Sequence, residues 1–309
     1  SEQSADLQPG DVIGASRSRI ERLPDLARAI LDRACILRAE TSLSRLSSMS
    51  SASATDTIDA VDLLLRQGLL SEQVPGKLQL AHDRLRELVE ELMGPRVHQG
   101  LHALAARTLQ EEQPQLADPI RRISRHLEQA GELDEAARWR VRAGSLAAES
   151  GATHQALRDL GEVLDFAPEH AHQQALRTRG RLLVDTGRLD AGRIDLERAL
   201  ALTPAEDTSA KAAAHVGLSY LAYRTGQPDS MVAHAEQASA LARGSEDMAL
   251  VMDVENALGI AHGSRGFCRE AIEHYRRSAR AAEAHGDTLR AAMRYNNIGI
   301  NQRLLGELS

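Results

Sequence analysis

The chain has 309 residues and a formal net charge of −7, so no overall basic field indicates binding to nucleic acid. Aromatic residues make up 2% of the sequence, whereas alanine, leucine, arginine and glutamate are abundant, which favours helices over sheets. No apolar run approaches the ~20 residues that a membrane-crossing helix needs, and no secretory signal is visible. The two cysteines lie far apart in apolar contexts and are expected to be buried, reduced thiols. We therefore expect a cytoplasmic protein without membrane contact.

The first part of the chain is predicted to be helical and without repeats. Residues 1–14 are polar and are predicted to form a linker or extended segment. Apolar residues recur at helical spacing from Ile20 to Leu37, which predicts one continuous helix there. The serine-rich residues 42–53 predict a short helix and a loop, and residues 56–67 predict an amphipathic helix that Gly68 stops.

The spacing of apolar residues changes after Gly68 from that of a helix to that of a strand. Residues 69–74 and 77–82 read as two strands around the turn Pro75-Gly76, and Asp83 is expected to cap the next helix. Three helices followed by a hairpin form the architecture of a winged helix, which we place with its trailing helices at residues 15–117. Direct DNA binding is not expected. The exposed positions of the would-be recognition helix carry three carboxylates, Asp56, Asp59 and Asp62, and one arginine, Arg66, and the carboxylates would repel phosphates.

Small residues recur in a fixed frame through the remaining two thirds of the chain. Six glycines are separated by 20, 36, 39, 40 and 40 residues, at Gly131, Gly151, Gly187, Gly226, Gly266 and Gly306. Seven residues before them stand Ser124, Gly144, Gly180, Ser219, Gly259 and Gly299, and five residues after the first five stand Ala136, Ala156, Gly192, Met231 and Ala271. This frame predicts helix–turn–helix repeats, since small residues let paired helices approach and glycine suits the turn. The 20-residue step leaves room for one helix, residues 133–149, shared by the first two units.

The order of small, turn, small, large and proline residues resembles the tetratricopeptide repeat (TPR) over residues 118–309. The predicted fold class is therefore mainly α: a winged-helix domain followed by a TPR-like α-solenoid of about five to six helix–turn–helix units. Because the last unit is half present and the chain starts at Ser1 without methionine, we expect a fragment of a larger protein.

A second resemblance concerns the first domain. The segments Arg19–Pro24, Gly68–Leu70 and Leu80–Val89 are similar to the winged-helix arm of bacterial STAND ATPases, which are signal-transduction ATPases with numerous domains. The resemblance implies an upstream ATPase domain that binds ATP or ADP in the parent protein, because these 309 residues contain no phosphate-loop motif. Ala81-His82-Asp83 resembles the family's Met-His-Asp motif, with alanine in place of methionine, which implies that His82 contacts the phosphates of bound ADP.

No catalytic constellation is found, and no metal site is predicted. His98 and His102 have the i, i+4 spacing of metal ligands but no third ligand, so a solvated helix face explains them better. The candidate ligand site is the inner face of the repeats, where side chains of the first helices project into a groove. Counted from the small-residue frame, these are Arg177, Arg181, Tyr220, Tyr223, Asn256 and Asn296.

The sequence thus favours a non-catalytic sensor arm of a STAND-type ATPase. Its groove would bind a peptide, a protein or an inducer, and the winged helix would couple that binding to the absent nucleotide-binding domain. Two alternatives stay open: a stand-alone TPR scaffold for protein–protein interaction, and the regulatory region of a serine/threonine-kinase-linked regulator. Exposed repeat ends would also allow the chain to form homo-oligomers.

Overall fold

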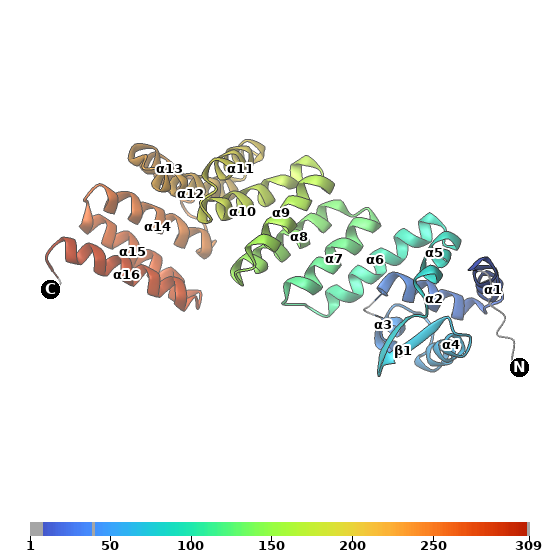
Figure 1. Ribbon diagram of the computed structural model, residues 1–309. Helices are drawn as coiled ribbons and strands as arrows, with labels where there is room; N and C mark the ends of the chain where they lie inside the picture. The colour runs from blue at the N-terminus through green and yellow to red at the C-terminus, as the bar shows by residue number, and fades with distance from the viewer. Residues whose placement is uncertain (1–8, 39–40, 308–309) are drawn as a thin grey trace, which may run out of the picture. The chain divides into compact units, whose positions relative to one another are not determined.

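The computed structural model describes residues 9–38 and 41–307 and divides into two compact units, Ser1–Trp139 and Arg140–Ser309. The described residues are mainly α-helical and form consecutive packed helix pairs, as in a TPR-like α-solenoid (Figure 1). The boundary between the two compact units falls inside a helix, after Trp139. The sequence placed the boundary between the first domain and the repeats earlier, at residue 118.

Before α8, the first unit contains four helices, a β-hairpin and three further helices. Its elements are α1 (Pro9–Glu21), α2 (Asp25–Leu37), α3 (Leu43–Ser48), α4 (Ala54–Arg66), β1 (Leu70–Val74), β2 (Lys77–Leu80), α5 (Asp83–Leu92), α6 (Pro95–Glu111) and α7 (Ala117–Ala130). The antiparallel strands pair Leu70 with Leu80, and the Leu78 N–H donates to the Thr41 carbonyl at 3.0 Å. Helix α2 lies at the centre of this unit and packs against α4, α5, α6 and β2.

Three predictions for this unit were wrong in detail. The helix predicted from Ile20 to Leu37 is broken, because Pro24 has no backbone N–H and takes the N-cap position of α2. Residues 9–14, predicted to be extended, belong to α1, and residues 1–8 lie outside the described residues. The cap of α5 falls on His82, one residue before Asp83.

The second unit is a series of helix pairs. Helix α8 (Leu133–Glu149) is the single helix that the 20-residue glycine step predicts, and the boundary between the two compact units falls within it. It is followed by α9 (Thr153–Phe166), the 3₁₀ turn η2 (Glu169–Ala171), α10 (His172–Asp185), α11 (Leu189–Leu202), α12 (Thr208–Arg224), α13 (Pro228–Leu241), α14 (Met248–Ser264), α15 (Cys268–Ala284) and α16 (Thr288–Leu304). Helices α10, α12 and α14 pack on α11, α13 and α15, and also touch one another in sequence.

The small-residue frame has a steric cause in this unit. A Cβ atom added to Gly259 would lie 2.6 Å from the Tyr275 ring, so only glycine lets α14 and α15 approach this closely. Serine occupies the same frame position on α12, where the Ser219 hydroxyl donates to the Met231 carbonyl of α13 at 2.9 Å. In the first unit, Ser124 donates in the same way to the Ala136 carbonyl, at 2.8 Å. Buried serine is thus accepted where its hydroxyl caps a carbonyl of the partner helix.

The turn glycines of the frame all have positive φ, with Gly187 at 82°. An L-residue with a Cβ atom is strained in this left-handed region, so we expect Gly187→Ala to lower the free energy of unfolding by about 1–2 kcal/mol. Gly187→Asn should cost less, because asparagine tolerates this conformation. Urea denaturation followed by circular dichroism measures both, and equal stability of the alanine variant and the wild type would contradict the expectation.

Each unit contains one free cysteine. Cys35 is fully buried in α2, and Cys268 is buried at the start of α15. Burial raises the pKa of the Cys35 thiol to about 12, with a smaller effect of the Glu90 charge. Both thiols are buried and unbridged, as the sequence predicts.

Candidate functional site

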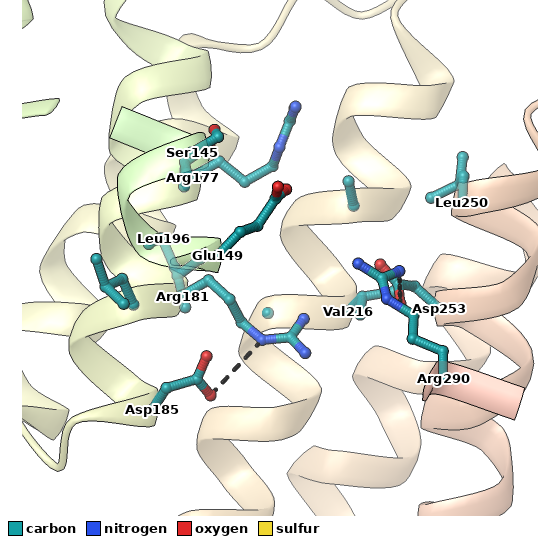
Figure 2. Close-up of a pocket in the computed structure, with 15 residues that line it drawn as sticks. Ser145, Glu149, Arg177, Arg181, Asp185, Leu196, Val216, Leu250, Asp253 and Arg290 are labelled. Atoms are coloured by element: carbon teal, nitrogen blue, oxygen red, sulfur yellow. Dashed lines mark hydrogen bonds and ion pairs between the residues drawn. The ribbon is translucent and has the colours of Figure 1, made fainter. Parts of the chain in front are cut away.

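A cavity of about 350 Å³ opens between the first helices of successive pairs in the second unit (Figure 2). Its walls come mainly from α8, α10, α12, α14 and α16, with Leu196 of α11 added, so the repeat stacking itself creates the space. This volume is at the lower end of the range for small-molecule sites. The lining residues used below are Glu149, Arg177, Arg181, Asp185, Ala213, Val216, Asp253 and Arg290.

Arg177 and Arg181 lie one turn apart on α10, and both line this cavity. Arg177 is half-buried, and desolvation lowers the pKa of its guanidinium, against the opposing effect of Asp207 and Asp247. Neither carboxylate forms an ion pair with Arg177 within 4.0 Å among the described residues. Asp207 accepts from the Ala210 N–H and Asp247 from the Ala249 and Leu250 N–H groups, so both carboxylates cap helices.

Arg181 is held by a long ion pair and an aromatic contact. Its buried Nε has no hydrogen-bond partner among the described residues, and the Asp185 carboxylate lies 4.0 Å away. The guanidinium carbon lies 5.0 Å from the centroid of the Tyr220 ring, at the distance of a cation–π contact. The aromatic face thus holds the guanidinium in place while leaving N–H groups unused.

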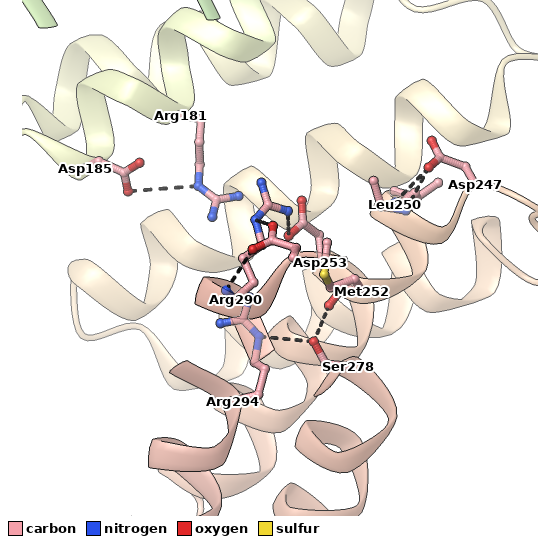
Figure 3. A network of polar contacts seen from close by, with 11 residues as sticks. Arg181, Asp185, Asp247, Leu250, Met252, Asp253, Ser278, Arg290 and Arg294 are labelled. Atoms are coloured by element: carbon pink, nitrogen blue, oxygen red, sulfur yellow. Dashed lines mark hydrogen bonds and ion pairs between the residues drawn. The ribbon is translucent and has the colours of Figure 1, made fainter. Parts of the chain in front are cut away.

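Arg290 on α16 also lines the cavity, and its charge is paired with carboxylates, whereas Arg294 lies outside the lining and is hydrogen-bonded to a serine (Figure 3). Arg290 lies 3.4 Å from the Asp253 carboxylate and 3.2 Å from Asp287. Arg294 donates from Nε to the Ser278 hydroxyl at 3.1 Å, and Ser278 donates to the Met252 carbonyl at 2.7 Å. Of the arginines that line the cavity, Arg177 is thus the one without an ion pair within the described residues.

The predicted groove residues occupy different surroundings. Arg177 and Arg181 line the cavity, whereas the other four are absent from its lining. Tyr220 is half-buried beneath Arg181, and exposed Tyr223 stacks on it with ring centroids 6.1 Å apart. Asn256 is half-buried, with an Oδ1 atom that has no partner among the described residues, and Asn296 is exposed.

The sequence missed Asp253, Arg290 and Val216 as cavity residues. Val216 stands three residues before Ser219, as Asn256 does before Gly259, and was overlooked because it is apolar. Asp253 lies six residues before Gly259 and Arg290 nine before Gly299, so the cavity extends two helical turns beyond the positions that were counted. Extending the frame by these turns would have found Asp253 and Arg290.

His82 lies in the first unit, exposed and directly before the first turn of α5. Its backbone is extended, with φ at −148°, and no side-chain cap bond joins it to the helix. A helix N-terminus favours an anion nearby, which is the physical setting that the resemblance requires. The exposed positions expected on α4 are also observed, since Asp56, Asp59, Asp62 and Arg66 all face solvent.

The prediction of a solvated helix face was wrong for His102. Its side chain is buried, and its Nδ1 lies 2.8 Å from the Nδ1 of His126 on α7. The ring of His98 lies 4.5 Å from that of His102, centroid to centroid. The helix pairing of α6 with α7 buries His102, which helical spacing alone does not reveal. Within residues 9–38 and 41–307, no group of three or more His, Cys, Asp or Glu side chains could hold a metal ion.

No helix in the described part of the chain is long and apolar enough to cross a membrane. No protein-family model matches the sequence, and no curated protein matches it either.

Solved structures show the fold. One similar structure is a signal transduction ATPase with numerous domains that carries a tetratricopeptide repeat sensor, from Pyrococcus horikoshii, with a TM-score of 0.54 and 12% identity. The match covers 99% of this chain and 50% of that one, so the chain spans about half the length of that structure. Another is a Rap protein complexed with Competence and Sporulation Factor, with a TM-score of 0.50, 14% identity, and coverage of 97% of this chain and 87% of that one. At this level of identity the likeness establishes the fold: a TPR-like α-solenoid.

Proposed function

We propose that the chain is the ligand-binding and coupling arm of a STAND-type signalling ATPase. In this proposal the groove of the second unit binds a peptide or protein segment. The observation that carries it is the cavity of about 350 Å³, which five first helices line together with mixed polar and apolar side chains. Such concave surfaces are what helical-repeat proteins use for partners.

The STAND assignment rests on the order of elements. Helices α2 to α4, a hairpin and α5 follow one another before the repeats, as in a winged helix, and a STAND protein with a repeat sensor shares the fold over nearly the whole chain. In the parent protein an upstream ATPase domain would bind ATP or ADP, and His82 would contact the ADP phosphates. The exposed carboxylates of α4 argue against DNA as the partner of this segment.

Groove binding is tested by selecting peptides from a random display library on the full chain. We expect selected peptides to bind the wild type and to lose at least about tenfold in affinity on Ala213→Phe, because the larger ring fills the cavity. The matched control is Ala233→Phe, an exposed position on α13 that should bind like the wild type. Circular dichroism confirms that both variants are folded.

Two outcomes would count against this function. Either no peptide is selected, or the peptides bind Ala213→Phe as tightly as they bind the control. The STAND assignment has its own test, which is the parent gene: a phosphate-loop domain is expected upstream of this segment. Its absence there would favour the stand-alone scaffold, and a kinase domain in its place would favour the kinase-linked regulator.

A further inference from the structure

Two neighbouring helix pairs of the second unit carry titratable side chains at the same positions of the repeat. On the first helices, His215 of α12 and Glu255 of α14 each stand four residues before the small residue that precedes the turn glycine. On the second helices, His234 of α13 and His274 of α15 each follow the turn glycine by eight residues. The α12–α13 pair therefore holds two histidines where the α14–α15 pair holds a carboxylate and a histidine.

In both helix pairs these side chains are in direct contact. The Nδ1 atoms of His215 and His234 lie 3.0 Å apart, and the ring centroids are 5.3 Å apart. The Nδ1 of His274 lies 2.8 Å from a carboxylate oxygen of Glu255. All four side chains are half-buried, so protons reach them from solvent while their charges are only partly screened.

Protonation affects the two contacts differently. Two neutral imidazoles in contact share one N–H between the facing nitrogens, and a first added proton leaves this bond intact, because the donor ring takes it on its Nε2. A second proton must occupy the acceptor Nδ1, which leaves two N–H groups and two like charges facing each other between His215 and His234. Protonation of His274 instead places opposite charges in contact, because Glu255 faces it.

The surroundings of the two histidines on α12 and α13 oppose their protonation. Desolvation lowers the pKa of His215, with smaller effects of His234 and of Lys211 one turn away. Desolvation also lowers the pKa of His234, against the opposing charge of Glu197 on α11. The unfolded chain thus binds protons more readily at these rings, whose ordinary pKa is 6.5. The stability of this contact is therefore present above pH 6.5 and is lost as the pH falls.

The Glu255–His274 contact is supported by further groups. Arg277 of α15 donates from Nε to the Glu255 carboxylate at 3.0 Å, and its Nη2 lies 2.9 Å from the His274 Nδ1. The ring of His262 on α14 stacks on that of His274, with centroids 5.0 Å apart. Burial raises the pKa of Glu255, but the bonds and charges of His274 and Arg277 outweigh it and lower the pKa. A negative charge therefore still faces His274 in mild acid.

We infer that the α12–α13 helix pair is an acid-sensitive element of the repeats, which opens in mild acid while α14–α15 stays closed. Because helical repeats contact mainly their neighbours, a weakened helix pair can open without unfolding of the whole array. Helix α12 contributes Ala213, Val216 and Gly217 to the cavity, so its opening removes one wall of the groove. This effect on the groove rests on the proposed function, whereas the opening itself does not.

The test is amide hydrogen exchange of the full chain, read helix by helix by mass spectrometry at pH 7 and pH 5 and corrected for intrinsic exchange. We expect the protection of α12 and α13 to fall about tenfold relative to that of α14 and α15. His215→Glu copies the second contact onto the first and should abolish this fall. Glu255→His makes the reverse change and should cause a similar fall in α14 and α15. His285→Gln, at an exposed histidine in the turn after α15, is the control and should behave like the wild type.

An equal change of protection in the two helix pairs of the wild type would overturn the inference, as would a His215→Glu variant that stays acid-sensitive. Should His215→Glu fail to fold at pH 7, His234→Gln also removes one imidazole of the pair and must abolish the fall.

The effect on the groove is measured separately, with the peptides selected at pH 7. Their affinity should fall at pH 5 for the wild type and be retained by His215→Glu. Unchanged binding by a wild type whose α12 and α13 have lost protection would contradict the effect on the groove alone. Failure to select any groove-binding peptide would contradict the proposed function and leave the exchange result standing.

Discussion

Gly192→Val should destabilise the second unit by about 3 kcal/mol, because α10 and α11 touch backbone to backbone at this point. A Cβ atom added to Gly192 would lie 2.9 Å from the Gly180 carbonyl oxygen and 2.7 Å from a Val184 methyl. The carbonyl belongs to the α10 hydrogen-bond ladder and cannot move aside cheaply, so the two helices must separate. Urea denaturation followed by far-ultraviolet circular dichroism measures the loss.

A second helical glycine serves as a control, because it tests whether the loss of stability comes from the close helix approach or from replacing any glycine. Gly161 lies within α9, and an added Cβ would approach only the Arg179 Nη1, at an ordinary 3.6 Å. Gly161→Ala should therefore stabilise the protein by about 0.5–1 kcal/mol, since alanine is the better helix former. A Gly192→Val variant as stable as the wild type would show that the α10–α11 approach is not close.

Acid should destabilise the first unit through the buried His102–His126 pair. Desolvation lowers the pKa of His102 from 6.5 to about 3 and that of His126 from 6.5 to about 4, with smaller effects of neighbouring positive charges. Between pH 6.5 and 4 the unfolded chain then binds more protons at these rings than the folded chain. Stability is therefore present above pH 6.5 and falls as the pH is lowered, by about 1.4 kcal/mol per pH unit for each imidazole.

This loss can be followed with the single tryptophan of the chain, because Trp139 lies in the first unit. Tryptophan fluorescence in urea, measured from pH 7 to 4.5, should show a midpoint that falls with pH. The double variant His102→Leu, His126→Leu should flatten this dependence, whereas His154→Gln, at an exposed histidine on α9, controls for losing an imidazole. A wild-type midpoint that does not change over this range would contradict the prediction.

The glycine frame predicted the repeats well because its causes are local. Positive φ at the turns and close backbone approach both select small residues, so Gly187 and Gly259 report the geometry directly. The shared helix at residues 133–149 followed from a spacing alone and is confirmed as α8. The hairpin around Pro75-Gly76 was found because a two-residue turn leaves a clear signature.

The errors arose where non-local packing decides. His102 resembles a surface residue in sequence, and only the approach of α7 buries it against His126. The caps at Asp207 and Asp247 are local, but the placement of these two carboxylates near Arg177 depends on how α10, α12 and α14 meet. Pro24 was the exception, since its effect on the helix is local and the pattern of apolar residues merely concealed it.

The placement of one buried cysteine in each compact unit makes the protein its own reporter of local opening. A thiol reagent can modify Cys35 or Cys268 only when the surrounding helices separate, so the two modification rates measure fluctuations of the two units independently. Because no engineered label is needed, ligand-induced stiffening of the repeats would be visible as slower modification of Cys268. The rate at Cys35 would show whether that stiffening is transmitted toward the hairpin.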